Sequence, residues 1–306
     1  MGKFGKDKRD IYYRLAKEEG YRARSAYKLL QIDDRFHVLE GVKRCVDLCA
    51  APGSWSQVLS RRLHADNAKQ KDKEQNEDVK IVAVDLQAMA PIPGVIQLQG
   101  DITNHSTATA IIGHFDGLSA DLVVCDGAPD VTGLHDIDTY IQAELLLAAV
   151  NITTHILKPG GIFIAKIFRG KDVSLLYSQL KIFFNEVIIS KPRSSRNSSI
   201  EAFAVCKGFH LPEGYQPTMF NTLIEGECKK YFEEIDNKSY LVNRKLIPFM
   251  ACGDLSGFDS DSTYPLSITD NYQYHEPRQK PIDPPYKKAI ELKKASALDK
   301  PSKEFD

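Results

Sequence analysis

Hydrophobic and polar positions follow two regular patterns between residues 21 and 206. Short apolar runs predict strands, and the stretches between them repeat their apolar side chains every three to four residues, as on one face of a helix. The predicted strands cover 44–49, 81–84, 95–98, 121–125, 162–167, 187–190 and 200–206. The predicted helices include 54–63, 137–157 and 173–184. The charged stretch 65–80 is predicted to be a surface loop.

Strands that alternate with helices indicate an α/β fold in which helices cover both faces of a mostly parallel sheet. The last two predicted strands are joined by the polar loop 191–199, which is too short for the crossover that parallel neighbours need. We therefore expect a seven-stranded sheet with six parallel strands and one reversed strand at an edge.

The distribution of charge and periodicity divides the chain into three parts. Residues 1–29 contain nine Lys or Arg and four Asp or Glu, whereas the whole chain has a formal net charge of −1. A basic segment of this kind is typical of a polyanion contact or of a solvated tail, and the charge leaves both open. Periodicity fades after Phe209. We predict a basic arm at 1–20, an α/β domain at 21–209 and a partly ordered extension at 210–306.

Composition limits the class of protein further. The six cysteines form no C-x-x-C pair, so we expect free thiols and no metal site. An apolar run of about 20 residues, which a membrane span needs, does not occur in the sequence. The polar first ten residues do not match a secretory signal. These features favour a cytoplasmic protein that does not enter the membrane.

A turn of small residues at 47–55 (DLCAAPGSW) joins the first predicted strand to its helix. Ligands of open α/β sheets bind at the carboxyl ends of the strands, and Gly53 allows a close approach to the backbone. The turn matches neither dinucleotide nor phosphate-loop signatures, which favours a ligand without phosphates. Asp85, Asp101 and Asp126 follow three strands and could accept hydrogen bonds from ribose or adenine. Each alone could also be a helix cap or turn former.

Four ionisable residues are candidates for chemistry. Lys166 lies inside an apolar strand, where a lysine is seldom buried without an acidic partner. Asp126 and Glu201 stand at the ends of other predicted strands, and Lys28 lies in the basic segment. The alternative for Lys166 is an edge position from which its amine reaches solvent. If both acids map to the same end of the sheet, the four side chains form one site.

These residues resemble the FtsJ/RrmJ family of RNA ribose 2′-O-methyltransferases, which have a Rossmann-like class I methyltransferase fold. The matching pieces are Ser25–Leu29, Asp47–Ser56, Asp126–Pro129, Lys166–Phe168 and Ser198–Glu201. The resemblance implies S-adenosyl-L-methionine as the cofactor and a catalytic tetrad of Lys28, Asp126, Lys166 and Glu201. It also implies cofactor contacts from Gly53, Trp55, Asp85, Asp101 and Asp126. The sequence departs from many members of the family at Cys49 and Ser54, where the substitutes are still small.

Within that family, four segments resemble the eukaryotic enzymes of the tRNA anticodon loop: 1–10 (MGKFGKDKRD), 126–136 (DGAPDVTGLHD), 192–196 (PRSSR) and 249–253 (FMACG). This resemblance implies methylation of the first loop nucleotide, the wobble nucleotide or both. It also implies helper proteins, one of the helical-repeat type and one of the WD-repeat type. Ribosomal RNA or an mRNA cap as the substrate, and a non-catalytic RNA-binding scaffold, remain as alternatives.

The chemistry of ribose methylation gives the tetrad a purpose. A 2′-hydroxyl must lose its proton during attack, and Lys166 would accept or orient that proton if burial and the neighbouring Lys28 lowered its pKa. The two acids would oppose this shift. The basic residues that flank the tetrad segments are predicted to contact RNA phosphates, with plain solvent exposure as the alternative. They are Arg22, Arg24, Arg169, Lys171, Arg193 and Arg196.

Overall fold

The fold is taken from a computed structural model, which describes residues 10–69, 79–128, 135–170, 173–217, 249–254, 256–264, 275–276, 278 and 291. Residues 1–9 of the predicted basic arm lie outside the described residues, as does Lys171. Among the described residues, none of the helices combines the length and the apolar character that a membrane crossing requires.

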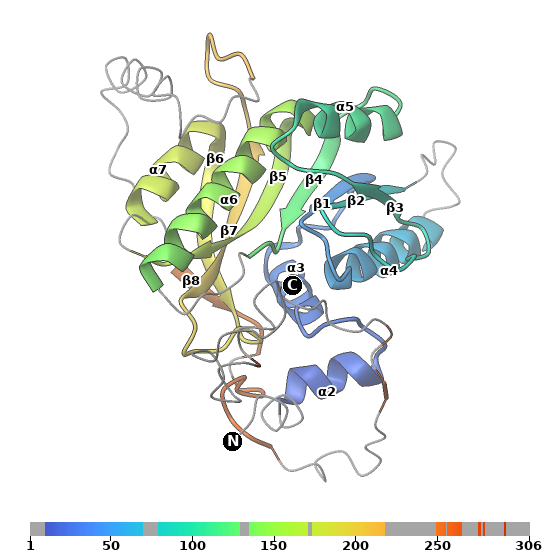
Figure 1. Ribbon diagram of the computed structural model, residues 1–306, viewed down its shortest axis with the longest axis vertical. Helices are drawn as coiled ribbons and strands as arrows, with labels where there is room; N and C mark the ends of the chain where they lie inside the picture. Colours follow the sequence, from blue (N-terminus) through green and yellow to red (C-terminus); the bar gives the residue numbers. More distant parts are fainter. Residues whose placement is uncertain are drawn as a thin grey trace, which may run out of the picture.

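One eight-stranded sheet forms the centre of the described part of the molecule, in the order β3-β2-β1-β4-β5-β7-β6-β8 (Figure 1). Its strands are β1 Arg44–Leu48, β2 Lys80–Asp85, β3 Ile96–Gln99, β4 Ala120–Cys125, β5 Leu157–Phe168, β6 Phe184–Pro192, β7 Glu201–Phe209 and β8 Phe249–Cys252. Strands β1 to β5 are parallel, β7 is antiparallel to both β5 and β6, and β8 is parallel to β6.

The predicted α/β fold is confirmed, with six parallel strands and one reversed strand among the first seven. The predicted edge position of the reversed strand is wrong, because β7 lies between β5 and β6. Helix α7 (Val173–Phe183) carries the chain past the neighbouring position, so that β7 can fold back into the gap. The predicted count of seven is also exceeded, because β8 from the predicted extension pairs with β6 from Ile189↔Phe249 to Pro192↔Cys252.

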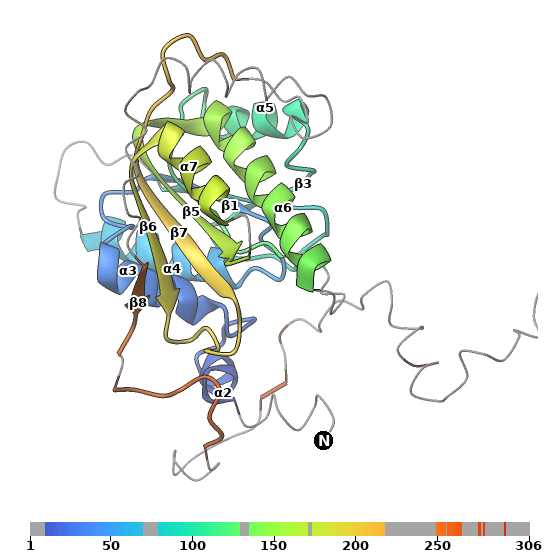
Figure 2. The same ribbon diagram turned by 90° about the vertical axis from the view of Figure 1, so that its left-hand side faces the viewer.

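Helices cover both faces of the sheet, as predicted. Figure 2 shows α3 and α4 on one face and α5, α6 and α7 on the other. The remaining helices are α2 Ile11–Glu18, α3 Ala26–Phe36, α4 Ser54–Lys69, α5 His105–His114 and α6 His135–Ile156. Helix α4 continues to Lys69, so the first part of the predicted loop 65–80 is helical. Residues 70–78 of that loop lie outside the described part of the chain.

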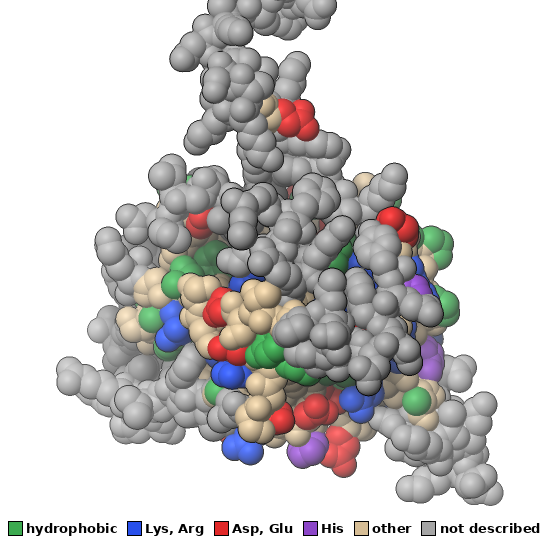
Figure 3. All heavy atoms as spheres, turned by 90° about the horizontal axis from the view of Figure 1, so that it is seen from below, with side chains coloured by type: hydrophobic (Ala, Val, Ile, Leu, Met, Phe, Trp, Pro, Cys, Tyr) green, Lys and Arg blue, Asp and Glu red, His purple; other side chains and the backbone are tan. Residues whose placement is uncertain are grey.

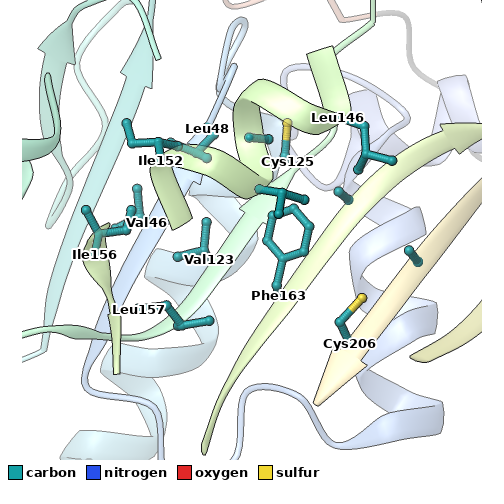
Figure 4. Close-up of a cluster of buried hydrophobic side chains, with 14 of the residues drawn as sticks. Val46, Leu48, Val123, Cys125, Leu146, Ile152, Ile156, Leu157, Phe163 and Cys206 are labelled. Carbon is teal, nitrogen blue, oxygen red and sulfur yellow. The ribbon is translucent and has the colours of Figure 1, made fainter. Parts of the chain in front are cut away.

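A hydrophobic core lies on each face of the sheet. On the α6 side, side chains of α6 such as Leu146 and Ile152 pack on Val46, Val123 and Phe163 (Figure 4). The opposite core includes Trp55 from α4, Leu29 from α3 and Phe203 from β7. Residues 45–48 of β1 and all six residues of β4 are buried. Burial on both faces explains why the central strands are continuous apolar runs rather than alternating ones.

Helix α2 occupies the second half of the predicted basic arm. Asp10 caps its N-terminus by accepting a hydrogen bond from the Tyr13 N–H at 3.2 Å. Ile11, Tyr12 and Ala16 are buried against the rest of the protein. The described part of residues 1–20 is therefore packed on the α/β domain.

Candidate active site

The sheet register places the tetrad at the carboxyl ends of β4 and β5. Cys125, the last residue of β4, is paired with Ala165 of β5. The residues that follow them, Asp126 and Lys166, therefore lie side by side. Because β7 runs in reverse, its first residue Glu201 pairs with Phe168 near the end of β5. The reversed strand thus brings an acid from its own beginning to the end where the parallel strands finish. Lys28 reaches the same place from α3.

The four charged groups alternate in sign and lie in mutual contact. Lys166 Nζ is 2.7 Å from Asp126 Oδ1 and 3.4 Å from Glu201 Oε2, and it donates to the Asp126 backbone oxygen at 2.8 Å. Lys28 Nζ is 2.8 Å from Glu201 Oε2 and 3.6 Å from Asp126 Oδ1. Two cations therefore face two anions, and this charge balance allows the group to be largely buried.

The electrostatics of the tetrad overturn one expectation. Burial by itself lowers the pKa of Lys166, but the charges of Asp126 and Glu201 outweigh it and raise that pKa above its ordinary value. The predicted lowering of the Lys166 pKa is therefore wrong for this structure. Burial alone raises the pKa of Glu201, whereas Lys28 and Lys166 together lower it below its ordinary value.

Two residues that support the tetrad were missed from the sequence. Ser195 donates from Oγ to Glu201 Oε1 at 2.5 Å, on the side of the carboxylate that Lys28 leaves open. Gln142 of α6 donates to the backbone oxygens of Gly127 and Lys166 at 3.2 Å each, which ties the end of β4 to that of β5. Gln142 could have been found as a polar residue in an apolar helix, whereas nothing distinguishes Ser195 from the other serines of its loop.

The turn after β1 adopts a conformation that requires glycine. Gly53 has φ +101°, and a Cβ there would lie 2.6 Å from Ile92 Cδ1 and 2.8 Å from Arg22 Nη1. Arg22 donates to the backbone oxygens of Pro52, Ala90 and Pro91 at 2.9, 2.7 and 2.9 Å. Its guanidinium thus fixes the turn to the segment that follows β2. The predicted phosphate contact of Arg22 stays a prediction beside this bracing role.

The predicted cofactor residue Trp55 turns its side chain into the core. Its indole N–H donates to Ser25 O at 2.8 Å, and its ring lies 5.6 Å from that of Phe203. Its backbone N–H lies in the first turn of α4, where the helix itself offers no acceptor. Trp55 can therefore meet a ligand at this end of the sheet through its backbone and not through its ring. The hydrogen bond from the Trp55 indole to Ser25 O also fixes α3, which carries Lys28, against α4.

Asp85 and Asp101 follow β2 and β3 at this end of the sheet. Asp85 accepts hydrogen bonds from the Ala51 and Gln87 N–H groups at 2.8 and 2.9 Å, and its own backbone oxygen accepts from Gly100 at 3.0 Å. Asp101 accepts from both N and Oγ1 of Thr103, so the turn-forming role considered for it is present. Asp85 is thus joined directly to the glycine turn, which makes it the better placed of the two.

A further carboxylate lies beneath the same turn. Asp47 of β1 is 1% exposed and accepts a hydrogen bond from Ser56 Oγ at 2.5 Å. Burial raises its pKa to about 7, and the charges of Asp126 and Asp85 add to this while the Ser56 hydrogen bond opposes it. Ser56 lies three residues after Gly53, so its hydrogen bond to Asp47 holds the start of α4 against the end of β1.

Two more of the predicted RNA contacts are engaged inside the protein. Arg24 and Arg196 both form ion pairs with Asp10, which is 5% exposed, and Arg24 also donates to Ser194 O. The predicted phosphate contacts of Arg24 and Arg196 stay predictions beside these ion pairs. Arg169 is exposed and Arg193 is partly exposed. On the side of the molecule where α2 lies, described side chains of both charges are interspersed (Figure 3).

Comparison with known proteins identifies the family. The model of the FtsJ-like methyltransferase family matches residues 21–209. The chain belongs to this family. An FtsJ-like methyltransferase from mouse, named "tRNA (cytidine(32)/guanosine(34)-2'-O)-methyltransferase", is 60% identical over 98% of this chain and 89% of its own length. A protein from the fission yeast Schizosaccharomyces pombe carries the same name and is 55% identical over 97% of this chain and 100% of its own length.

A solved structure agrees with the fold of this FtsJ-like methyltransferase. A chain from Plasmodium falciparum, described as a ribosomal RNA methyltransferase, superposes with a TM-score of 0.54 at 27% identity. It covers 62% of this chain, and 98% of its own length is matched. The agreement thus concerns the α/β domain that carries both the tetrad and the glycine turn.

The enzyme takes its methyl group from S-adenosyl-L-methionine, and the turn fits such a ligand. The turn offers backbone N–H donors at the start of α4 and an acceptor, the carboxylate of Asp85, which suits ribose hydroxyls. The basic side chain at the turn, Arg22, is already bonded to three carbonyl oxygens. A ligand without phosphate groups is what these donors would hold.

Proposed function

We propose that this FtsJ-like methyltransferase transfers a methyl group to ribose 2′-hydroxyls of the tRNA anticodon loop, at positions 32, 34 or both. The observation that carries the proposal is the complete set of Lys28, Asp126, Lys166 and Glu201, gathered at one end of the sheet next to the glycine turn. The names of relatives that match nearly the whole chain support the choice of tRNA.

The tetrad residues have distinct tasks in this reaction. When bound, S-adenosyl-L-methionine supplies an electrophilic methyl group on a positively charged sulfur. Gly53, the Trp55 backbone and Asp85, with Asp101 and Asp126, would hold it at the strand ends. Lys166 Nζ, at the centre of the tetrad, orients the attacking hydroxyl and takes up its proton. Asp126 and Glu201 fix the position of Lys166, and Lys28 balances their charge.

The raised pKa of Lys166 has a consequence for the timing of proton transfer. An ammonium group cannot accept a proton, so Lys166 must release its own proton to solvent before the hydroxyl attacks. A positive charge bound beside Asp126 would weaken the attraction that keeps Lys166 protonated. We therefore propose that Lys166 becomes a proton acceptor in the loaded enzyme, and that it serves mainly as a hydrogen-bond donor in the empty one.

The RNA surface, the partners and the location of the protein complete the proposal. Arg169 is exposed and Arg193 is partly exposed, and with Lys171 they would contact phosphates next to the target ribose. The other proposed phosphate contacts are those of Arg22, Arg24 and Arg196. The helical-repeat and WD-repeat helper proteins implied by the resemblance remain proposed partners. We also propose a cytoplasmic location, with 21–209 as the methyltransferase domain and the flanking segments engaged with tRNA or partners.

Mass-spectrometric mapping of 2′-O-methylated nucleosides provides the test. In tRNA from cells that lack the protein, methylation should be lost at position 32, 34 or both, and purified protein with its helpers should restore it. Ribosomal RNA treated in parallel tests the main alternative substrate. Loss of methyl groups from ribosomal RNA alone would overturn the proposal, and binding of tRNA without any transfer would support the scaffold alternative.

A further inference from the structure

The loop between β6 and β7, residues 193–200, contacts the active site through Ser195 and contacts residues outside 21–209 through Ser198. Its Ser195 is 2% exposed and donates to Glu201 Oε1, while Lys28 donates to Glu201 Oε2. The carboxylate of Glu201 is therefore held at both oxygens. Lys28 belongs to helix α3, whereas Ser195 belongs to a loop that needs further contacts to fix its position.

Several of the contacts that fix this loop come from residues outside 21–209, the part that the family model matches. Asp261 accepts hydrogen bonds from both N and Oγ of Ser198, at 3.0 and 2.9 Å. The backbone oxygen of Cys252, in β8, accepts from the Arg193 N–H at 2.5 Å. Asp10 pairs with Arg196 at 3.3 Å. We call strand β8 together with residues 256–264 the clamp.

The clamp is itself anchored to the folded domain. Strand β8 pairs with β6 over four residues, which places Cys252 beside Pro192 at the start of the loop. The Phe258 backbone oxygen accepts a hydrogen bond from Tyr12 Oη of α2 at 3.1 Å. The clamp thus begins in the sheet, passes α2 and reaches Ser198, and it holds the loop on both sides of Ser195.

We propose that the clamp is a positioning element of the catalytic site, in which Asp261 holds the loop 193–200 so that Ser195 fixes the carboxylate of Glu201. The inference rests on the proposed function for its substrate, but its contacts are within the protein. Asp261 does not touch the tetrad and is a positioning residue rather than a catalytic one. Displacing a supporting group by about 1 Å can cost up to 100-fold in rate, so a loosened Glu201 should slow transfer measurably.

The chain provides a matched control for this test. Asp254, which lies between the two parts of the clamp and is also exposed, accepts hydrogen bonds from N and Oγ of Ser256 at 2.9 and 2.6 Å. Asp261→Ala and Asp254→Ala therefore remove the same kind of carboxylate and the same kind of hydrogen bonds. One change releases the loop, whereas the other leaves it held. Asp261→Asn keeps an acceptor for Ser198 and should restore most of the activity.

In single-turnover methylation of tRNA, Asp261→Ala should lower the rate constant for transfer about tenfold and change the KM for tRNA less than about twofold. Asp254→Ala should leave both within about twofold of the unmodified enzyme. The proposal is overturned if Asp261→Ala raises KM alone, or if the two alanine variants behave alike. The double variant of Asp261→Ala and Ser195→Ala provides a further test. Because both changes act on Glu201 through the same contact, the rate constant for transfer should fall by less than the product of the two separate decreases.

Amide hydrogen exchange gives a readout that needs no substrate. In Asp261→Ala the amides of 194–201 should exchange about tenfold faster or more, while those of β1 and β4 keep the protection of the unmodified protein. Unchanged exchange in the loop would refute the clamp whatever the substrate is. An unmodified protein that exchanges as expected but does not methylate tRNA would instead refute the proposed function and leave the clamp standing.

Discussion

Two buried carboxylates at the same end of the sheet, Glu201 and Asp47, respond to burial in opposite ways. Burial raises the pKa of both. For Glu201 the ammonium groups of Lys28 and Lys166 outweigh burial and lower the pKa below its ordinary value. For Asp47 burial prevails and the pKa rises to about 7, because its close partner is the hydroxyl of Ser56 and the nearby charges of Asp126 and Asp85 are negative.

The difference shows how the active site divides its work. The tetrad balances its charges internally, so it can stay ionised while buried and can act on a proton. The region beneath the glycine turn has no such balance, and Asp47 serves to hold β1 and α4 together with or without its charge. Burial alone thus does not identify a catalytic carboxylate, and the sign of the neighbouring charges separates the two cases. Changes on each side of this comparison should have effects of different kinds and sizes.

The largest effect is expected from Lys166→Met, which keeps the stem of the side chain and removes the amine. Methyl transfer should fall by ~10²–10⁴, the usual contribution of a positioned proton acceptor, with little change in S-adenosyl-L-methionine binding. Lys181→Met, the same change on the partly exposed face of α7, should leave the rate nearly unchanged. Single-turnover kinetics would measure both. A folded Lys166→Met protein within a few-fold of the unmodified rate would contradict the mechanism.

Removing the carboxylate that joins the turn to β2 should affect binding instead. Asp85→Ala should weaken S-adenosyl-L-methionine binding by ~1–3 kcal/mol, because ribose hydroxyls would lose a charged acceptor. Isothermal titration calorimetry would measure this, with Asp34→Ala on the surface of α3 as the control. An unchanged affinity would exclude Asp85 from the cofactor site.

Asp47→Asn tests the other side of the comparison through the pH dependence of stability. A carboxyl whose pKa rises from 3.8 to about 7 on folding holds its proton more tightly in the folded protein. The free energy of unfolding should therefore fall as the pH rises from about 4 to about 7. Asparagine keeps an acceptor for Ser56 but cannot ionise. The variant should be more stable than the unmodified protein by roughly 1–2 kcal/mol at pH 8, with little difference near pH 4.

Asp121 of β4 provides the contrasting variant, and urea denaturation at pH 4 and pH 8 would measure the stability of both variants. Burial alone raises its pKa, but the ammonium of Lys158 and the N–H groups of Arg44 and Lys43 lower it below its ordinary value. Asp121→Asn should therefore destabilise the protein at pH 8, where Asp47→Asn stabilises it. If both variants lose stability at pH 8, charge balance is not what separates the two kinds of carboxylate.

The smallest effect is expected on the RNA surface. Arg169 is exposed next to the end of β5, and Arg169→Gln should weaken tRNA binding a few-fold. The dependence of log K on log salt should become shallower by about 0.7, the value for one contact with a single-stranded phosphate. Filter binding at several KCl concentrations would measure the slope. An unaltered slope would remove Arg169 from the proposed interface.

The fold class, the glycine turn and the four residues of the tetrad could be predicted from the sequence alone. These depend on local information: apolar periodicity, a turn that only small residues allow, and ionisable residues next to apolar strands. Lys166 was conspicuous because a lysine is rare inside a run such as GIFIAKIF. The family comparison then confirmed the resemblance that those residues carry.

The position of β7, the pairing of β8 and the ion pairs of Asp10 could be learned only from the folded protein. Strand order and ion pairing depend on which distant segments meet, and Asp10 lies 186 residues from its partner Arg196. The direction of the Lys166 pKa shift also depended on distances, because burial and two acids act on it with opposite signs. The residue types indicated which forces act on the site, and the packed structure decided which force is larger.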